Sequence, residues 1–288
     1  PALGSQQVGT VRSSALAFDT LPAMKRLHAM LDRLRRWLGL AHPLPLVTDA
    51  QWARVEATLP FLDYLEPGDR PRLRRMALEF LACKQFHGAH DFALHDDMLL
   101  SIALQASLPV LNIGLDAYKG WVGVVVYAGD FIIPRREYDE AGVVHEYDVE
   151  ALGEAWEGGP VLLSWFEGEA QPFGVNVVIH EFAHKLDMEN GSVDGLPRLK
   201  PGMARTHWAD AFSSAYESFC DEVERGVHTE IDSYGAEHPG EFFAVVSEVF
   251  FETPHVLQRR FPQVYEQLVL FYGVNPVVRE TLFRGGPA

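Results

Sequence analysis

The chain has 288 residues, 48% of them hydrophobic and 22% charged, as is ordinary for a globular protein of one or two domains. Its net charge of −16 argues against direct binding to nucleic acid or to an anionic membrane surface, because both require a basic footprint. No stretch approaches the roughly 18 apolar residues of a membrane span, and no signal-peptide pattern opens the sequence. The two cysteines, Cys83 and Cys220, indicate free thiols, so we expect a cytoplasmic protein.

The first 107 residues predict a tail followed by helices. Residues 1–20 are small and polar and predict a mobile tail. Apolar residues recur every three or four positions over 21–40, 49–59, 71–85 and 96–106, with Thr48 as a cap for the second of these helices. We therefore expect a helical N-terminal region over 21–107, which either stands apart or forms one continuous domain with the rest from residue 21.

Three histidines, His87, His90 and His95, fall in a short loop-like stretch between two of these helices. Their spacing fits no zinc template well. Surface histidines are therefore the favoured interpretation over a metal site.

The pattern then changes to that of strands. Segments rich in β-branched and aromatic residues predict strands over 121–127, 131–138, 143–147 and 161–166, with a turn at 128–130. The piece that ends at Gly158 reads as short helix or irregular chain. We expect an α+β protein in which a mostly antiparallel sheet directly precedes, and packs on, the segment 173–191.

That segment, FGVNVVIHEFAHKLDMENG, predicts a helix that Gly191 caps. Its H-E-x-x-H spacing places His180 and His184 one turn apart on the same face, where two imidazoles can share one Zn²⁺. Glu181 would lie beside the metal, near a bound water. The pattern predicts the active-site helix of a zinc metallopeptidase, and the alternative is a purely structural helix without metal.

A catalytic zinc site needs a third protein ligand from another element. Helices are predicted over 207–225, 241–252 and 261–272. Glu241 opens the apolar run EFFAVVSEVFFE, and spacing favours it as a ligand no more than as an ordinary surface residue. His238 and His228 are weaker alternatives.

The segments NVVIHEFAHKLDMENG (176–191) and SYGAEHPGEFFAVVSEVFFETP (233–254) resemble the Mlc titration factor A family of zincin metallopeptidases, and more distantly the anthrax lethal factor catalytic domain. The resemblance covers most of residues 70–280. It implies a zincin-like catalytic region, which we place at 108–288, with helices before and after the sheet. It also implies that His180, His184 and Glu241 bind zinc, that Glu181 is the general base and that Tyr234 is an active-site tyrosine.

Related zincins often carry an acidic residue four positions after the third ligand, where it orients a zinc histidine. Val245 stands there in this chain, so Asp187 or Glu248 is expected to take that place.

The helix motif predicts hydrolysis of a peptide or protein through a zinc-bound water, with Glu181 as base. The resemblance implies that Tyr234 donates a hydrogen bond to the oxyanion. The strand over 161–166 is the candidate edge for an extended substrate. The family further suggests aminopeptidase action and a transcriptional repressor as protein partner. The alternative function is a zinc-stabilised regulatory protein that mainly sequesters that partner.

Overall fold

One hydrophobic core joins a small sheet to the helices around it, and it runs from Trp52 to Val274. The computed structural model describes residues 46–138, 144–166 and 175–277, which belong to one unit beginning at Leu44. The tail expected over 1–20 and the helix expected over 21–40 lie outside the described residues. The described chain is a mixed α+β structure.

The helices begin close to the positions that their capping residues predict. Thr48 forms a capping box with Gln51, and Pro254, expected to end one helix, also begins the next. In chain order the α-helices are α2 (Asp49–Glu56), α3 (Asp69–Cys83), α4 (Asp96–Ser107), α5 (Val177–Asp187), α6 (Arg205–Glu224), α7 (Pro239–Glu252), α8 (Pro254–Arg260) and α9 (Pro262–Tyr272).

The strands form two sheets. Their bounds are β1 (Gln85–Gly88), β2 (Gly123–Ala128), β3 (Phe131–Tyr138), β4 (Val144–Ala151), β5 (Gly153–Ala155) and β6 (Val161–Trp165). The four-stranded sheet has the order β1-β2-β6-β5, and β3 pairs with β4 as a separate hairpin. Within the four-stranded sheet, β1 and β2 are parallel, as are β2 and β6, whereas β5 and β6 are antiparallel. The expectation of a mostly antiparallel sheet on the α5 helix is therefore wrong, because that sheet is mixed.

Two short strands escaped the sequence analysis, and they change which strands form the edges. β1 occupies the stretch expected to be a loop, and β5 occupies the piece expected to be helical or irregular. Each is only three or four residues long, too short for a periodic signal. β6 lies between β2 and β5, so the strand expected at 161–166 to be the substrate edge has no unpaired side. β5 is the edge strand of the described sheet next to β6.

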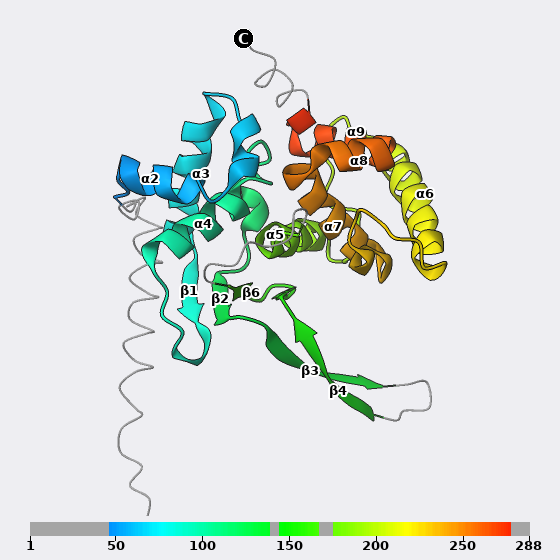
Figure 1. The fold of residues 1–288 in the computed structure, drawn as a ribbon, viewed down its shortest axis with the longest axis horizontal. Coiled ribbons are helices and arrows are strands. Elements are labelled where there is room, and N and C mark those ends of the chain that lie inside the picture. The colour runs from blue at the N-terminus through cyan, green and yellow to red at the C-terminus, as the bar shows by residue number, and fades with distance from the viewer. Residues whose placement is uncertain (1–45, 139–143, 167–174, 278–288) are drawn as a thin grey trace, which may run out of the picture. The chain divides into compact units, whose positions relative to one another are not determined.

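Helix α5 lies between the four-stranded sheet and α7, and it contacts β5 and β6 on one side and α7 on the other (Figure 1). Its apolar residues are buried almost all round, as expected for a helix inside a core. Phe182 packs among the rings of Phe80, Tyr118 and Trp121 at centroid distances of 5.4, 5.2 and 5.8 Å. These aromatic contacts fix the rotation of α5, and with it the direction in which its polar residues point.

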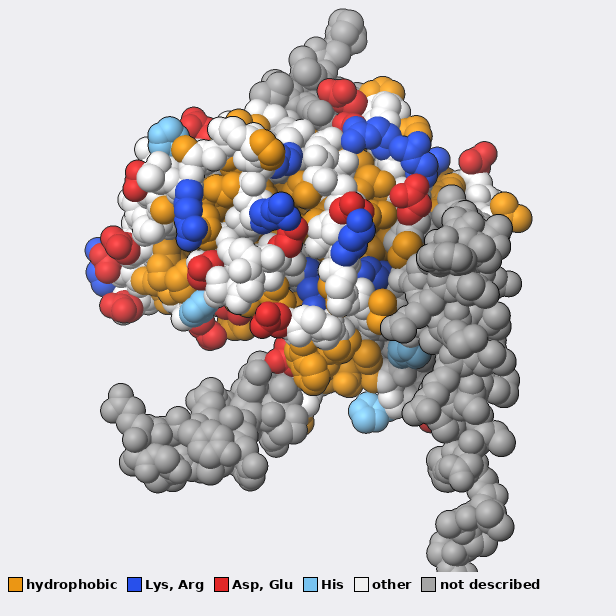
Figure 2. Space-filling model, turned by 180° about the vertical axis from the view of Figure 1, so that it is seen from behind, with side chains coloured by type: hydrophobic (Ala, Val, Ile, Leu, Met, Phe, Trp, Pro, Cys, Tyr) orange, Lys and Arg blue, Asp and Glu red, His pale blue; other side chains and the backbone are white. Residues whose placement is uncertain are grey.

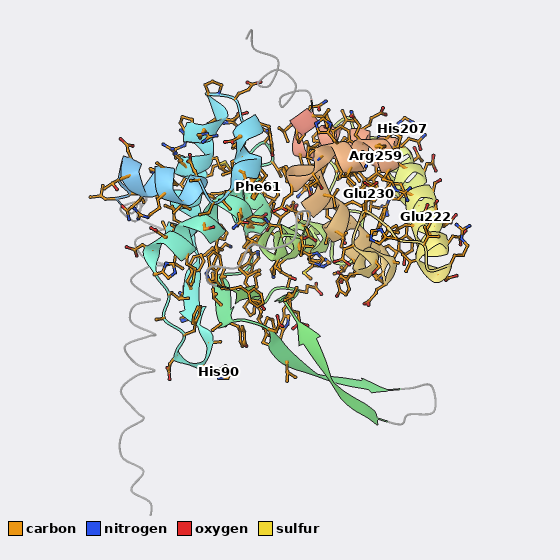
Figure 3. The ribbon with its side chains drawn as sticks, viewed as in Figure 1. Phe61, His90, His207, Glu222, Glu230 and Arg259 are labelled. Carbon is orange, nitrogen blue, oxygen red and sulfur yellow. The ribbon has the colours of Figure 1, made fainter. Side chains whose placement is uncertain are left out.

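Charges of both signs share the surface. On the face shown in Figure 2, Lys and Arg side chains are interspersed with Asp and Glu. On α8, Arg259 donates to both carboxylate oxygens of Glu230 at 2.7 and 2.8 Å (Figure 3), and Arg260 pairs with Glu222 of α6. Within the described residues, no helix combines the length and the apolar character that crossing a bilayer requires.

Candidate metal centre

The polar residues of α5 are held in place from its first turn. The helix begins at Val177, because the side chain of Asn176 caps it by accepting a hydrogen bond from Ile179 N at 2.9 Å. Residues 173 and 174 of the segment expected to be helical lie outside the described residues. The Asn176 amide nitrogen donates to Gln105 Oε1 of α4 and to Glu252 Oε1 of α7, at 2.7 and 2.8 Å. One residue thus joins three helices directly before the histidines. Gly191 takes a φ of 92° after the last helical turn, as its predicted capping role requires.

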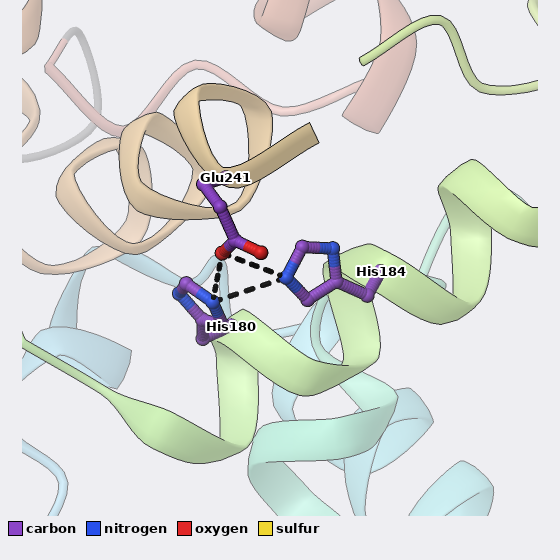
Figure 4. Close-up of side chains that lie close together, drawn as sticks. All are labelled: His180, His184 and Glu241. Atoms are coloured by element: carbon purple, nitrogen blue, oxygen red, sulfur yellow. Dashed lines mark hydrogen bonds and ion pairs between the residues drawn. The ribbon is translucent and has the colours of Figure 1, made fainter. Parts of the chain in front are cut away.

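His180, His184 and Glu241 come together as the sequence predicts (Figure 4). The Nε2 atoms of the two histidines lie 3.1 Å apart, and each lies 3.1 Å from Glu241 Oε2. Their side chains are 12%, 8% and 21% exposed, so the triangle is largely shielded but reachable. Among the described residues, this is the group of His, Cys, Asp or Glu side chains that could hold a metal ion.

Glu241 reaches the histidines because the loop after α5 packs tightly on the first turn of α7. The buried carboxylate of Asp187 accepts a hydrogen bond from Gly195 N at 2.8 Å. A Cβ on Gly195 would lie 2.6 Å from the Pro239 carbonyl oxygen, and one on Gly240 would lie 2.6 Å from Val193. Glycine at both positions therefore permits the close backbone contact that places Glu241.

Glu248, two turns beyond Glu241, supplies the carboxylate that orients His180. Its Oε1 lies 2.7 Å from His180 Nδ1, and its Oε2 accepts a hydrogen bond from the Asn176 backbone. Burial acts against a charged His180, but Glu248 and Glu241 outweigh it and raise the pKa of this imidazole. Of the two residues expected to orient a histidine, Glu248 makes the contact, whereas Asp187 binds Gly195.

The donor set fits a divalent metal ion. With the proton of His180 Nδ1 directed at Glu248, the lone pair of its Nε2 faces His184 Nε2 and the Glu241 carboxylate. Three electron-rich atoms that converge in this way repel one another unless a cation lies between them. The 3.1 Å sides of the triangle approach the roughly 3.3 Å separation set by zinc bonds of about 2.0–2.1 Å in a tetrahedron.

Glu241 and Glu181 carry pKa shifts of opposite direction. Burial acts to raise the pKa of Glu241, but its hydrogen bonds and charge interactions with His180 and His184 hold that pKa well below its usual range. Burial raises the pKa of Glu181 to about 8, and His180 opposes this shift while Glu241 and Glu248 add to it. Two carboxylates with pKa values pushed apart are typical of an acid–base site.

Glu181 lies against the edge strand of the sheet. A Cβ on Gly153 of β5 would be 2.4 Å from Glu181 Oε1, so the carboxylate and this strand are in direct contact. Glu181 is 4% exposed, and its Oε2 is a buried oxygen that accepts no hydrogen bond from the described residues. A buried, unsatisfied acceptor is costly, which indicates that a donor such as water occupies this position in the working site.

Tyr234 lies at the rim of the cluster. It belongs to the short helix η5 (Ser233–Ala236), where Asp232 accepts a hydrogen bond from its backbone N at 3.0 Å. Its ring centroid is 6.0 Å from that of His180, and the residue is 45% exposed. Tyr234 therefore lies close to His180 and is also open to solvent.

The other histidines considered from the sequence lie elsewhere. His238 caps α7 by accepting from Gly240 N at 3.1 Å, and His228 is exposed. His95 caps α4 through Met98 N, and the ring of His90 packs on Tyr127 beyond β1 (Figure 3). Sequence reasoning missed Asn176 and Lys185, although an asparagine directly before an apolar helix is itself a capping signal.

The helix with two facing histidines, the carboxylate that α7 adds as the third group and the buried glutamate together define a metallopeptidase. Comparison with known families agrees: the glucose-regulated metallo-peptidase M90 family matches residues 32–273, and the chain belongs to this family.

Relatives cover most of the chain. An uncharacterized protein of Synechocystis is 37% identical over 76% of this chain and 82% of its own length. Proteins named Mlc titration factor A are similar too. That of Escherichia fergusonii is 33% identical over 85% of this chain and 93% of its own length, and that of Serratia proteamaculans is 34% identical over 85% and 94%.

Proposed function

We propose that this chain is a zinc peptidase of the gluzincin type, with a zincin-like catalytic region, in which His180, His184 and Glu241 hold the ion. The observation that carries the proposal is the triangle of 3.1 Å separations between three lone-pair donors, with His180 oriented by Glu248. Two imidazoles and one carboxylate are the ligand set of several catalytic zinc sites. Zinc in this place would act as a Lewis acid on the scissile carbonyl and would lower the pKa of water.

Glu181 is the general base of this proposal. Its unsatisfied Oε2 accepts the proton of the attacking water, and the same carboxyl group then passes the proton to the leaving amine. Burial raises the pKa of Glu181 to about 8, and a cation held by the neighbouring ligands would favour its ionised form. Tyr234 donates a hydrogen bond to the developing oxyanion, a contact typically worth ~2.7–4 kcal/mol.

The substrate is an extended peptide that adds to the free edge of β5. β5 pairs with β6 on one side and, among the described strands, with none on the other. Because Gly153 contacts Glu181, a peptide hydrogen-bonded along β5 passes directly beside the base. Removal of single N-terminal residues, the aminopeptidase form of the reaction, is the version that we propose to test first.

The decisive experiment is cleavage of a peptide library by the purified protein, with and without chelator, alongside Glu181→Gln. We expect cleavage that chelator abolishes, one zinc per chain in both proteins, and no cleavage by the variant. Normal cleavage by Glu181→Gln would refute this mechanism. A zinc content well below one per chain would instead favour a structural helix without metal.

We also propose a second role, the binding of a repressor protein in the cytoplasm. It is supported by the name Mlc titration factor A, which several relatives of this chain carry. Titration calorimetry with purified Mlc and the Glu181→Gln variant would test it. If Glu181→Gln still binds Mlc, the two functions are separate. If neither the wild-type protein nor the variant gives a heat of binding with Mlc, the role is excluded.

A further inference from the structure

Lys185, the residue after His184, is a lysine buried inside the molecule. It is 4% exposed, and its ammonium donates hydrogen bonds to the backbone carbonyls of Trp156 and Gly159, the second at 2.9 Å. Its Nζ also lies 4.9 Å from the centre of the Trp121 ring. Burying a charge is costly unless it is paired, and the two carbonyls and the Trp121 ring are the groups that offset this cost for Lys185.

The carbonyls that Lys185 binds belong to the tight turn between β5 and β6. Gly159 N donates to Trp156 O at 3.0 Å, and Trp156 N donates to Pro160 O at 3.1 Å. Gly158 has a φ of 60°, and a Cβ on Gly159 would lie 2.8 Å from Trp156 Cβ. A turn built on two glycines is intrinsically flexible, and the hydrogen bonds from Lys185 hold this turn against α5.

Helix α5 therefore holds the edge strand at two points. Glu181 contacts Gly153 at the start of β5, and Lys185, four residues after Glu181 on the same face of α5, binds the turn that follows β5. The intervening strand is three residues long, Gly153–Ala155, so its whole length lies between these contacts. The distance between the strand and Glu181 is set by one steric contact and one charged contact.

We propose that Lys185 is a positioning residue that fixes β5 against α5 and so places an extended peptide beside Glu181. This inference rests on the proposed function, in which β5 is the substrate edge. The hydrogen bonds of Lys185 go to the turn after β5. Its contribution is to keep the peptide on β5 at the distance that Glu181 requires, and a shift of about 1 Å in such a position can lower the rate about 100-fold.

A second, half-buried lysine offers a control with the same kind of contacts. Lys84 Nζ lies 3.5 Å from the centre of the same Trp121 ring and donates to Tyr118 O and Trp121 O at 2.6 and 2.7 Å. The chemistry is the same, but the backbone that Lys84 holds lies before β2 and not beside β5. Replacing either lysine by methionine removes one ammonium and leaves two backbone carbonyls without their hydrogen-bond donor.

The test compares Lys185→Met with Lys84→Met in the full chain. We expect Lys185→Met to lose about 10- to 100-fold in kcat/KM on an extended peptide. It should keep one zinc per chain, and its amides over 153–160 should exchange hydrogen faster. Both variants should lose thermal stability, because each removes a hydrogen-bonded ammonium. Lys84→Met should nevertheless keep kcat/KM within about twofold of wild type and wild-type hydrogen exchange over 153–160.

The inference is wrong if Lys185→Met keeps wild-type kcat/KM or wild-type exchange over 153–160, or if Lys84→Met shows the same losses. Should Lys185→Met not fold, Lys185→Gln, which retains a donor, should show an intermediate loss. If the wild-type protein cleaves no peptide, the proposed function fails instead. The exchange comparison still decides whether Lys185 holds the strand.

Discussion

His180 Nδ1 lies 2.7 Å from Glu248 Oε1, and the other oxygen of this carboxylate binds the backbone of the residue that caps α5. Glu248 therefore controls both the orientation of one proposed ligand and the start of the helix that carries two of them. It stands two turns from Glu241 on α7, so one face of α7 supplies the third ligand and the residue that orients the first.

Removing the charge of Glu248 should weaken metal binding. Glu248→Gln keeps the shape of the side chain but reduces its strength as an acceptor for His180, so we expect zinc affinity to fall about 10- to 100-fold. Competition with a coloured chelator measures this directly. Glu252→Gln is the control, because Glu252 accepts a hydrogen bond from the side-chain amide of the same Asn176. Equal loss in both variants would assign the effect to the cap of α5.

A side chain at Gly153 should displace the base. Gly153→Ala places a Cβ 2.4 Å from Glu181 Oε1, so either the carboxylate or the strand must move. We expect kcat to fall about 100-fold or more while one zinc per chain is retained. Gly68→Ala, which meets nothing within 4 Å, should leave kcat unchanged. Wild-type turnover in Gly153→Ala would contradict the contact between β5 and Glu181.

Asp187 should stabilise the loop that leads to α7. In Asp187→Ala the buried Gly195 N–H loses its acceptor, so we expect unfolding to become easier by about 1–3 kcal/mol. Zinc affinity should fall too, because the Gly195 backbone packs on the first turn of the helix that carries Glu241. Denaturant titration and chelator competition measure the two effects. Asp194→Ala, in the exposed part of the loop, should cost much less.

Lys84 should make the stability of the protein depend on pH. Burial lowers its pKa from 10.5 to about 8 in the folded protein. Between these values the unfolded chain holds the proton and the folded chain does not, so the contribution of Lys84 to stability rises with pH. The stability difference between wild type and Lys84→Met should therefore increase from pH 8 towards pH 10. A difference that stays constant over this range in denaturant titrations would contradict the lowered pKa.

The sequence by itself determined the local parts of this protein. Apolar periodicity and caps located the main described helices within a few residues, because these signals come from neighbours one turn apart. The H-E-x-x-H spacing brought His180 and His184 to one face for the same reason. Glu241 joined them through a family resemblance, since spacing alone left it no better than an ordinary surface residue.

Only the tertiary structure decided what lies around those residues. The contact between His180 and Glu248 spans 68 positions, and the hydrogen bond between Lys185 and Trp156 spans 29. The order of the strands, which makes β5 and not β6 the edge, depends on pairings that also join distant segments. Long-range contacts of this kind follow from how whole elements pack, and no local pattern in the sequence encodes them.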